Sequence, residues 1–110
     1  MNRHFAILVL LLAAVLEAGG DALIRLALHR QGFAARAAAF VLGAVVLFAY
    51  GYTVNAPPWD FGRLLGLYVV FFFVVAQVMS WLLFGQTPSR AVLFGGSLIV
   101  SGGFLIAFLQ

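Results

Sequence analysis

Three charged side chains, Glu17, Asp21 and Arg25, stand inside an apolar stretch that is long enough to cross a lipid bilayer. Their spacing of four and eight positions places them on one face of a helix, because an α-helix turns once in 3.6 residues. A charged side chain near the middle of a membrane costs about 2.5–3.5 kcal/mol on insertion scales. This face therefore has to meet protein or water, and its groups are the first candidates for chemistry.

Glu17 is the strongest candidate for a proton or cation site. If the helix begins near Phe5, Glu17 lies about 18 Å along the axis, close to the middle of a hydrocarbon core about 30 Å thick. Desolvation disfavours the charged form of a carboxyl group, so a proton and a cation would compete for it there. The alternative is a neutral Glu17 that is hydrogen-bonded to a facing helix.

Asp21 and Arg25 follow each other in the acid-before-base order that is favourable at a spacing of four positions. We predict a structural ion pair between them, with the Arg25 side chain extending toward the lipid headgroups. Asp21 is also the second candidate for binding a substrate or a proton. His4 and His29 lie at opposite ends of the same stretch and the chain has no cysteine, so we expect no metal site.

The composition indicates an integral membrane protein. The 110 residues are 65% hydrophobic and 8% charged, and their mean hydropathy of +1.16 is more than a soluble domain of this size needs. The net charge of +3 comes from arginines at the boundaries of apolar stretches, where positive charge anchors membrane helices. We therefore expect the lipid bilayer and not nucleic acid as a partner. No catalytic triad, phosphate loop or metal motif is recognisable, so we expect neither an enzyme nor a cofactor.

We predict one all-α membrane domain over residues 1–110 with four spanning helices. The expected spans are residues 5–28, 34–54, 62–84 and 89–109. Pro57 and Pro58 end the second span, and Pro88 and Ser89 open the fourth. Because the connections are short, sequential helices should pack antiparallel. The bias in arginines between the two sides is too small to specify an orientation in the membrane.

The fourth span contains a stripe of small residues. Gly95 and Gly96 are followed seven positions later by Gly102 and Gly103, with Ser97 between the two pairs. Residues seven apart lie on one side of a helix, and small side chains there let another helix approach closely. We predict a subunit interface through Gly96, Ser97 and Gly103. The alternative is packing within one four-helix bundle.

Three segments of the chain resemble the small multidrug resistance (SMR) transporters. Glu17-Ala-Gly-Gly-Asp-Ala-Leu-Ile-Arg25 is similar to their first-helix pattern. Ser80-Trp-Leu-Leu-Phe-Gly-Gln86 is similar to the end of their third helix, and Gly96-Ser-Leu-Ile-Val-Ser-Gly-Gly103 to their fourth-helix dimer motif. Together with the length and the four spans, the resemblance covers most of the chain.

The resemblance implies an antiparallel homodimer in a bacterial-type inner membrane, with two Glu17 carboxyl groups forming one site. Protons and a small cationic substrate would occupy this site in turn, as it opens alternately to each side. The resemblance also places Tyr68 where the family has a substrate-facing aromatic residue. From their positions alone, the other aromatic candidates are interpreted as interface anchors or packing residues: Tyr50, Tyr52, Trp59 and Trp81.

The chain departs from the family pattern mainly in its third helix. The stretch 69–73 is bulky (Val-Val-Phe-Phe-Phe) where the family has small residues, and Leu65 stands where the family has a tyrosine. Asp21 replaces a small polar residue. These departures keep open a lipid or metabolite transporter or flippase component of the wider drug/metabolite transporter superfamily. They also keep open a helper subunit without transport activity, in which the charged face is an assembly contact.

Overall fold

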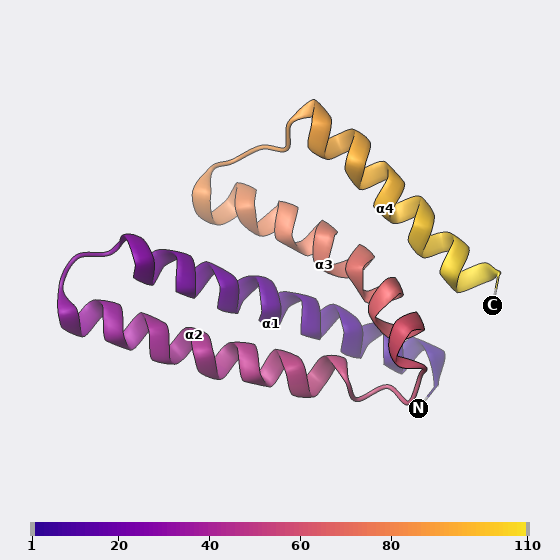
Figure 1. Cartoon of the computed structure of the whole chain (residues 1–110), viewed down its shortest axis with the longest axis horizontal. Coiled ribbons are helices and arrows are strands. Elements are labelled where there is room, and N and C mark those ends of the chain that lie inside the picture. Colours follow the sequence, from indigo (N-terminus) through magenta and orange to yellow (C-terminus); the bar gives the residue numbers. More distant parts are fainter. Residues whose placement is uncertain (1, 110) are drawn as a thin grey trace.

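The structure, a computed structural model, describes residues 2–109 and consists there of four α-helices joined by short connections (Figure 1). The helices are α1 (Arg3–His29), α2 (Phe33–Val54), α3 (Phe61–Phe84) and α4 (Arg90–Phe108). Each is long and apolar enough to cross a membrane. The prediction of an all-α fold with four helices long enough to span a membrane is confirmed, and each helix begins and ends within two residues of the expected span. Residues 1 and 110, the ends of the predicted domain, lie outside the described residues.

Polar side chains and a glycine set several of the helix ends. The Asn2 side chain accepts a hydrogen bond of 2.8 Å from the Phe5 N–H at the start of α1. Ser89 accepts one of 3.2 Å from the Val92 N–H, so the residue expected to open the fourth span does cap it. Gly85 ends α3 with a φ of 64°, in the left-handed region that favours glycine.

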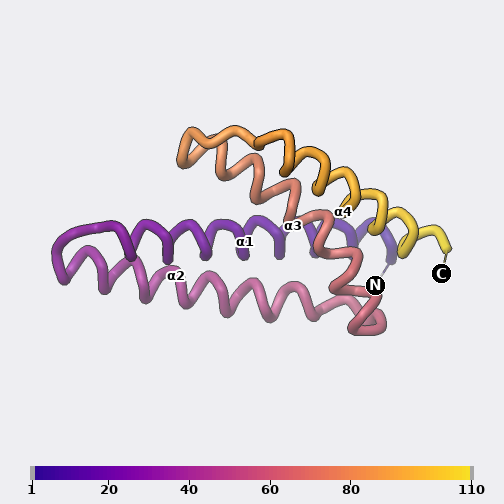
Figure 2. Tube along the Cα trace, turned by 45° about the horizontal axis from the view of Figure 1, so that its top comes forward, coloured from indigo at the N-terminus to yellow at the C-terminus, as the bar shows by residue number. Residues whose placement is uncertain are grey.

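The helices α1 and α2 form an antiparallel hairpin in which glycines allow a close approach (Figures 1 and 2). A Cβ on Gly20 of α1 would lie 2.6 Å from Leu47 Cδ2 of α2. A Cβ on Gly43 of α2 would lie 2.8 Å from Ile24 Cδ1 and 3.3 Å from the Gly20 carbonyl oxygen. Membrane helices associate through such close contacts, because lipid removes the hydrophobic drive between them.

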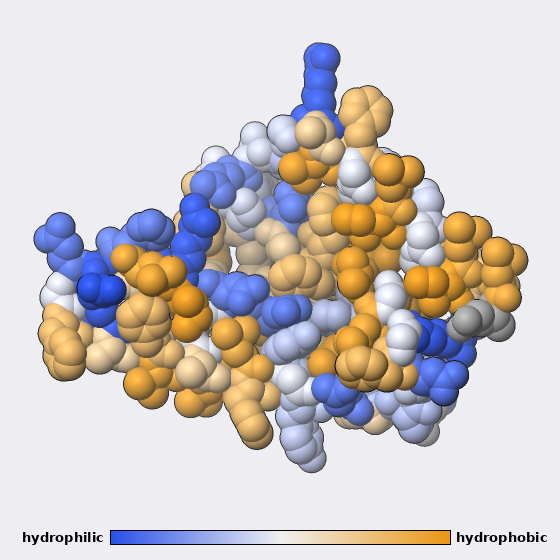
Figure 3. Space-filling model, viewed as in Figure 1, coloured by the Kyte–Doolittle hydropathy of each residue, from blue (hydrophilic) through white to orange (hydrophobic). Residues whose placement is uncertain are grey.

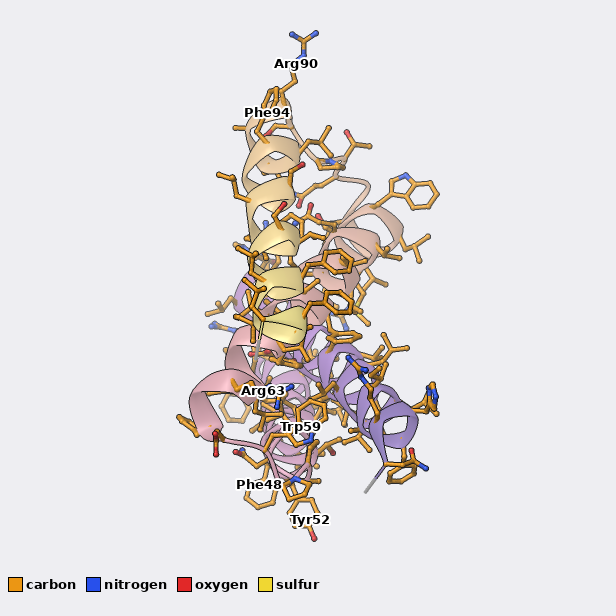
Figure 4. All side chains as sticks on the ribbon, turned by 90° about the vertical axis from the view of Figure 1, so that its right-hand side faces the viewer. Phe48, Tyr52, Trp59, Arg63, Arg90 and Phe94 are labelled. Atoms are coloured by element: carbon orange, nitrogen blue, oxygen red, sulfur yellow. The ribbon has the colours of Figure 1, made fainter. Side chains whose placement is uncertain are left out.

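The enclosed core is small and lies where α1, α2 and α3 meet, and most other large apolar side chains point outward. The core residues are Leu10, Ala13, Ala14, Val54, Leu64 and Tyr68. Phe48 and Tyr52 of α2 keep 77% and 78% of their surface exposed and extend away from the helices in Figure 4. Figure 3 shows apolar surface over much of α4 and polar surface at the α1–α2 turn. An outer surface this apolar suits contact with lipid, which supports the assignment as a multi-pass membrane protein.

The helix α4 packs on α3 through two of its glycines. Gly96 faces the Phe73 ring and Gly103 faces Val70, and a Cβ at either position would overlap the α3 side chain. Both glycines are buried, whereas Ser97 is exposed. Side chains of α3 from the same chain thus lie above both glycines, which is the packing expected within one bundle, while the subunit interface stays a prediction. Of the three residues predicted for a subunit interface, Ser97 is exposed in the single chain.

The bulky stretch 69–73 of α3 gains a packing role from this arrangement. Val70 and Phe73 fill the two glycine positions of α4. On another side of α3, Phe72 lies against Tyr68, with ring centroids 6.3 Å apart and planes tilted by 31°. The bulky stretch 69–73, which departs from the SMR pattern, thus packs against α4 on one side and beside Tyr68 on another.

Candidate functional site

Glu17 and Tyr68, two residues predicted from the sequence for one site, are joined directly in the structure. The Tyr68 hydroxyl donates a hydrogen bond of 2.8 Å to Glu17 Oε1, across 51 positions of sequence. Tyr68 is only 4% exposed and Glu17 is partly buried. A hydroxyl that donates to a carboxylate is among the stronger hydrogen bonds in proteins. The contact therefore fixes the membrane-embedded carboxyl group of α1 to α3.

The small residues of α1 allow this contact. Ala13 and Ala14 precede Glu17 by about one turn and are fully buried in the core with Leu64 of α3. Alanine at these positions lets α3 come close to α1, because no longer side chain holds the backbones apart. Tyr68 lies one turn after Leu64 and so reaches the carboxyl group one turn further along α1.

Tyr50 of α2 adds a third group to the site. Its ring centroid lies 5.8 Å from that of Tyr68, with the planes tilted by 32°, and its phenol comes close to the Glu17 carboxyl group. From the sequence, Tyr50 is interpreted only as an anchor or packing residue. The position of Gly20 could have indicated that Tyr50 faces Glu17. Once Gly20 is paired with Leu47, moving three positions along each antiparallel helix brings Glu17 opposite Tyr50.

Asp21 and Arg25 line a separate cavity of about 270 Å³ between α1 and α3, whose lining begins at Ala18 on α1. Within residues 2–109 the two side chains form no ion pair. The Arg25 guanidinium instead lies over the Phe84 ring, 5.3 Å from its centroid. A cation–π contact at an exposed site contributes about 0.5–1 kcal/mol, as much as an exposed ion pair. The cavity thus presents an acid and a base that each remain available to a bound group.

The arrangement around Glu17 combines one carboxyl group with aromatic surface. Two aromatic faces lie beside one carboxyl group, and aromatic faces attract cations. A cation that replaces the Tyr68 hydroxyl at Glu17 would meet opposite charge and aromatic surface together. The residues that the structure describes contain no group of three or more His, Cys, Asp or Glu side chains that could hold a metal ion. The site is thus built from one carboxyl group and two phenols.

Comparison with known proteins gives the family. The chain is 33% identical to a "UPF0060 membrane protein" of Clostridium perfringens (strain SM101 / Type A), over 98% of this chain and 96% of that protein. It is also 33% identical to a protein of the same name from Herpetosiphon aurantiacus, over 62% of this chain and 64% of the relative. No family model and no solved structure matches the chain. The match to the clostridial protein spans nearly the whole of both chains, and the chain belongs to the UPF0060 membrane protein family.

Proposed function

We propose that this protein is an SMR-like transporter that exports a small cationic or amphipathic substrate in exchange for protons, through a site built on Glu17. The observation that carries the proposal is the hydrogen bond from Tyr68 to Glu17, which holds a carboxyl group beside two aromatic rings. These are the two positions to which the resemblance to the SMR transporters assigns proton and substrate binding.

Competition for one carboxyl group couples the two fluxes. A cation that binds the Glu17 carboxylate displaces its proton to water, and a proton that arrives from the other side displaces the cation. The cation loses part of its hydration shell on entering the membrane, and the faces of Tyr50 and Tyr68 compensate for that loss. Because binding of one species excludes the other, neither crosses without an exchange.

A second copy of the chain belongs to the proposal. In one chain Glu17 is only partly buried and Asp21 is exposed, so the site is open on one side. An antiparallel homodimer in the inner membrane would close that side and bring a second Glu17 to the same site. Ser97 and the other exposed residues of α4 are available for the subunit contact. The Ser97 hydroxyl donates to the Leu93 carbonyl oxygen of its own helix, 2.9 Å away, and so needs no partner in the other copy.

A lipid or metabolite transporter is the second candidate, and the cavity at Asp21 favours it. Asp21 and Arg25 stand one helical turn apart without pairing. Such a pair suits a zwitterion, whose cationic group would meet Asp21 while its anionic group meets Arg25. In this case the substrate would bridge the two side chains of α1 and would not need to replace a proton on Glu17.

Proton release on substrate addition tests the proposal directly. In detergent, the purified parent protein is mixed with guanidinium, quaternary ammonium and polyamine compounds, and proton release is measured. In liposomes, proton movement across the membrane is measured with the same compounds. We expect the parent to release protons and Glu17→Gln to release none, with unchanged helical content and oligomer size. Glu17→Asp should retain some transport with a changed pH profile, because the carboxyl group is kept one methylene further back.

Asp21→Asn is the matched control and should have the milder effect. Unchanged proton release in Glu17→Gln would move the site to Asp21. If no cation releases protons from the parent while a zwitterion is transported, the second candidate is correct. A stable complex with an unrelated protein, in the absence of any transport, would identify a helper subunit instead.

A further inference from the structure

A larger cavity, of about 690 Å³, lies between α3 and α4 and extends to the start of α1. Its volume is within the range of about 300–1,000 Å³ that small-molecule pockets occupy. The walls between the two helices are apolar and include Phe71 and Val100. Two positive side chains, Arg3 and Arg63, complete the lining, and no carboxylate belongs to it among the described residues. This cavity is separate from the residues proposed for transport.

Arg63 carries a polar atom that the fold leaves without a hydrogen-bond partner. Its Nε is buried and has no hydrogen-bond partner among the described residues. Its guanidinium lies 5.8 Å from the centroid of the Trp59 ring, and Figure 4 shows the two side chains together. A buried donor without a partner is costly, and the cost is larger when the group is charged. The planar guanidinium fits the oxygens of a phosphate or carboxylate, so an anion would supply the partner that Nε lacks.

The position of the arginines in the helices indicates where this anion comes from. Arg3 begins α1, Arg63 stands in the first turn of α3 and Trp59 lies just before that helix. Both helix starts lie at one face of the membrane, where arginine and tryptophan meet the lipid headgroups. The apolar part of the cavity continues from there along α3 and α4, at the depth of the acyl chains. The two arginines suit the charged headgroup of a lipid, and the apolar part of the cavity suits its acyl chain.

We infer that this cavity binds an anionic phospholipid, with its phosphate between Arg3 and Arg63 and one acyl chain between α3 and α4. Basic pockets between membrane helices are known to hold anionic headgroups. The charge of the arginines selects a lipid with a net negative charge over a zwitterionic one. This binding is independent of the cation exchange proposed for Glu17.

Native mass spectrometry of the detergent-purified protein tests the inference, with phosphatidylglycerol and phosphatidylcholine of the same acyl chains as probes. We expect phosphatidylglycerol to bind more tightly than phosphatidylcholine. Arg3→Gln and Arg63→Gln should each weaken phosphatidylglycerol binding about fivefold, and the double variant about thirtyfold. Arg90→Gln is the matched control, because Arg90 extends away from the helices at the opposite end of α4 (Figure 4). It should bind the lipid as the parent does.

A second variant tests the apolar half of the cavity while keeping both arginines. Ala107→Trp adds a large ring to the α4 wall and should also weaken phosphatidylglycerol binding, with unchanged helical content. Glycerol phosphate, which has no acyl chain, should bind at least tenfold more weakly than the lipid. The inference is overturned if the double arginine variant binds phosphatidylglycerol like the parent, or if glycerol phosphate binds as tightly as the lipid. It is also overturned if Ala107→Trp dissociates an oligomer without affecting lipid binding, because a second copy would then occupy the groove.

Discussion

The helix α3 makes two contacts of opposite kinds. Toward α1 it presents Tyr68, whose hydroxyl donates a single hydrogen bond to Glu17. Toward α4 it presents Val70 and Phe73, which fill the space above two glycines. A hydrogen bond to a carboxylate can be exchanged for a bond to a ligand, whereas closely packed side chains cannot separate without leaving a void. The comparison indicates that packing fixes the α3–α4 contact at these glycines, whereas the α1–α3 contact includes a bond that a ligand could replace.

The largest effect on stability is expected at the α3–α4 contact. Gly103→Leu places a branched side chain where Val70 already stands, and overpacking of this kind should lower the free energy of unfolding by about 3 kcal/mol. Thermal unfolding in detergent, followed by circular dichroism, measures this loss. Gly102→Leu is the matched control, because nothing lies within 4 Å of a Cβ at that position. If the two variants are equally stable, α4 does not pack on α3 through Gly103.

The second-largest effect is expected on transport, and Tyr68→Phe tests it by removing only the hydroxyl group. Tyr68→Phe keeps the ring in the core but removes a hydrogen bond to a charged group, which contributes about 1.5–3 kcal/mol. Because a bound cation no longer has to replace this hydroxyl, we expect the transport rate at low substrate concentration to rise roughly ten- to hundredfold, with a changed pH profile. The thermal midpoint should fall, because the carboxyl group loses its partner. Liposome flux assays over a range of pH values give the rate and the pH profile, and thermal unfolding gives the midpoint.

Two tyrosines of α2 provide comparison variants for the Tyr68→Phe measurement. Tyr50→Phe should have a smaller effect, because Tyr50 faces the same carboxyl group without the direct bond that Tyr68 makes. Tyr52→Phe should have none, since Tyr52 is 78% exposed on the outer side of the helix. If all three variants transport at the same rate as the parent, the phenol of Tyr68 positions nothing and the α1–α3 contact is packing alone.

The elements of the fold could be predicted because membrane spans are marked locally. Long apolar runs, a pair of prolines after the second span and a serine cap before the fourth define each helix within its own sequence. Glu17 could be identified for the same reason, since its depth follows from counting along one helix. Tyr68 needed the resemblance to a known family, because nothing within α3 shows that it faces α1.

Contacts between helices were harder to predict, because each depends on a register that local sequence does not contain. The small residues at Gly96 and Gly103 show that something approaches α4 closely, but not whether it is α3 or a second copy. Tyr50 was missed because its place opposite Glu17 follows only from the pairing of Gly20 with Leu47. The partner of Arg25 was missed too, since Phe84 is distant in sequence while Asp21 is one turn away.

The smallest expected effect comes from Asp21 and Arg25, and it tests whether the charged face of α1 is a pair or two separate groups. In the structure Arg25 contacts Phe84 and does not form an ion pair with Asp21. Arg25→Ala should therefore lower the free energy of unfolding by about 0.5–1 kcal/mol, the worth of an exposed cation–π contact. Phe84→Leu should cost a similar amount and should add nothing to Arg25→Ala, because both changes remove the same contact.

The double variant of Asp21→Asn and Arg25→Ala separates the two possibilities. If the groups act independently, their effects on the free energy of unfolding should add to within about 0.3–0.5 kcal/mol. An ion pair predicts a different result, since either single change would then remove the whole interaction and the second change would cost little more. Thermal unfolding of the parent, both single variants and the double variant measures this coupling.

A coupling energy well above the additive limit would show that Arg25 leaves Phe84 to pair with Asp21, and that the acid and the base of the smaller cavity neutralise each other. A coupling energy near zero would show that the two groups act separately, and would leave both side chains available to a zwitterionic substrate.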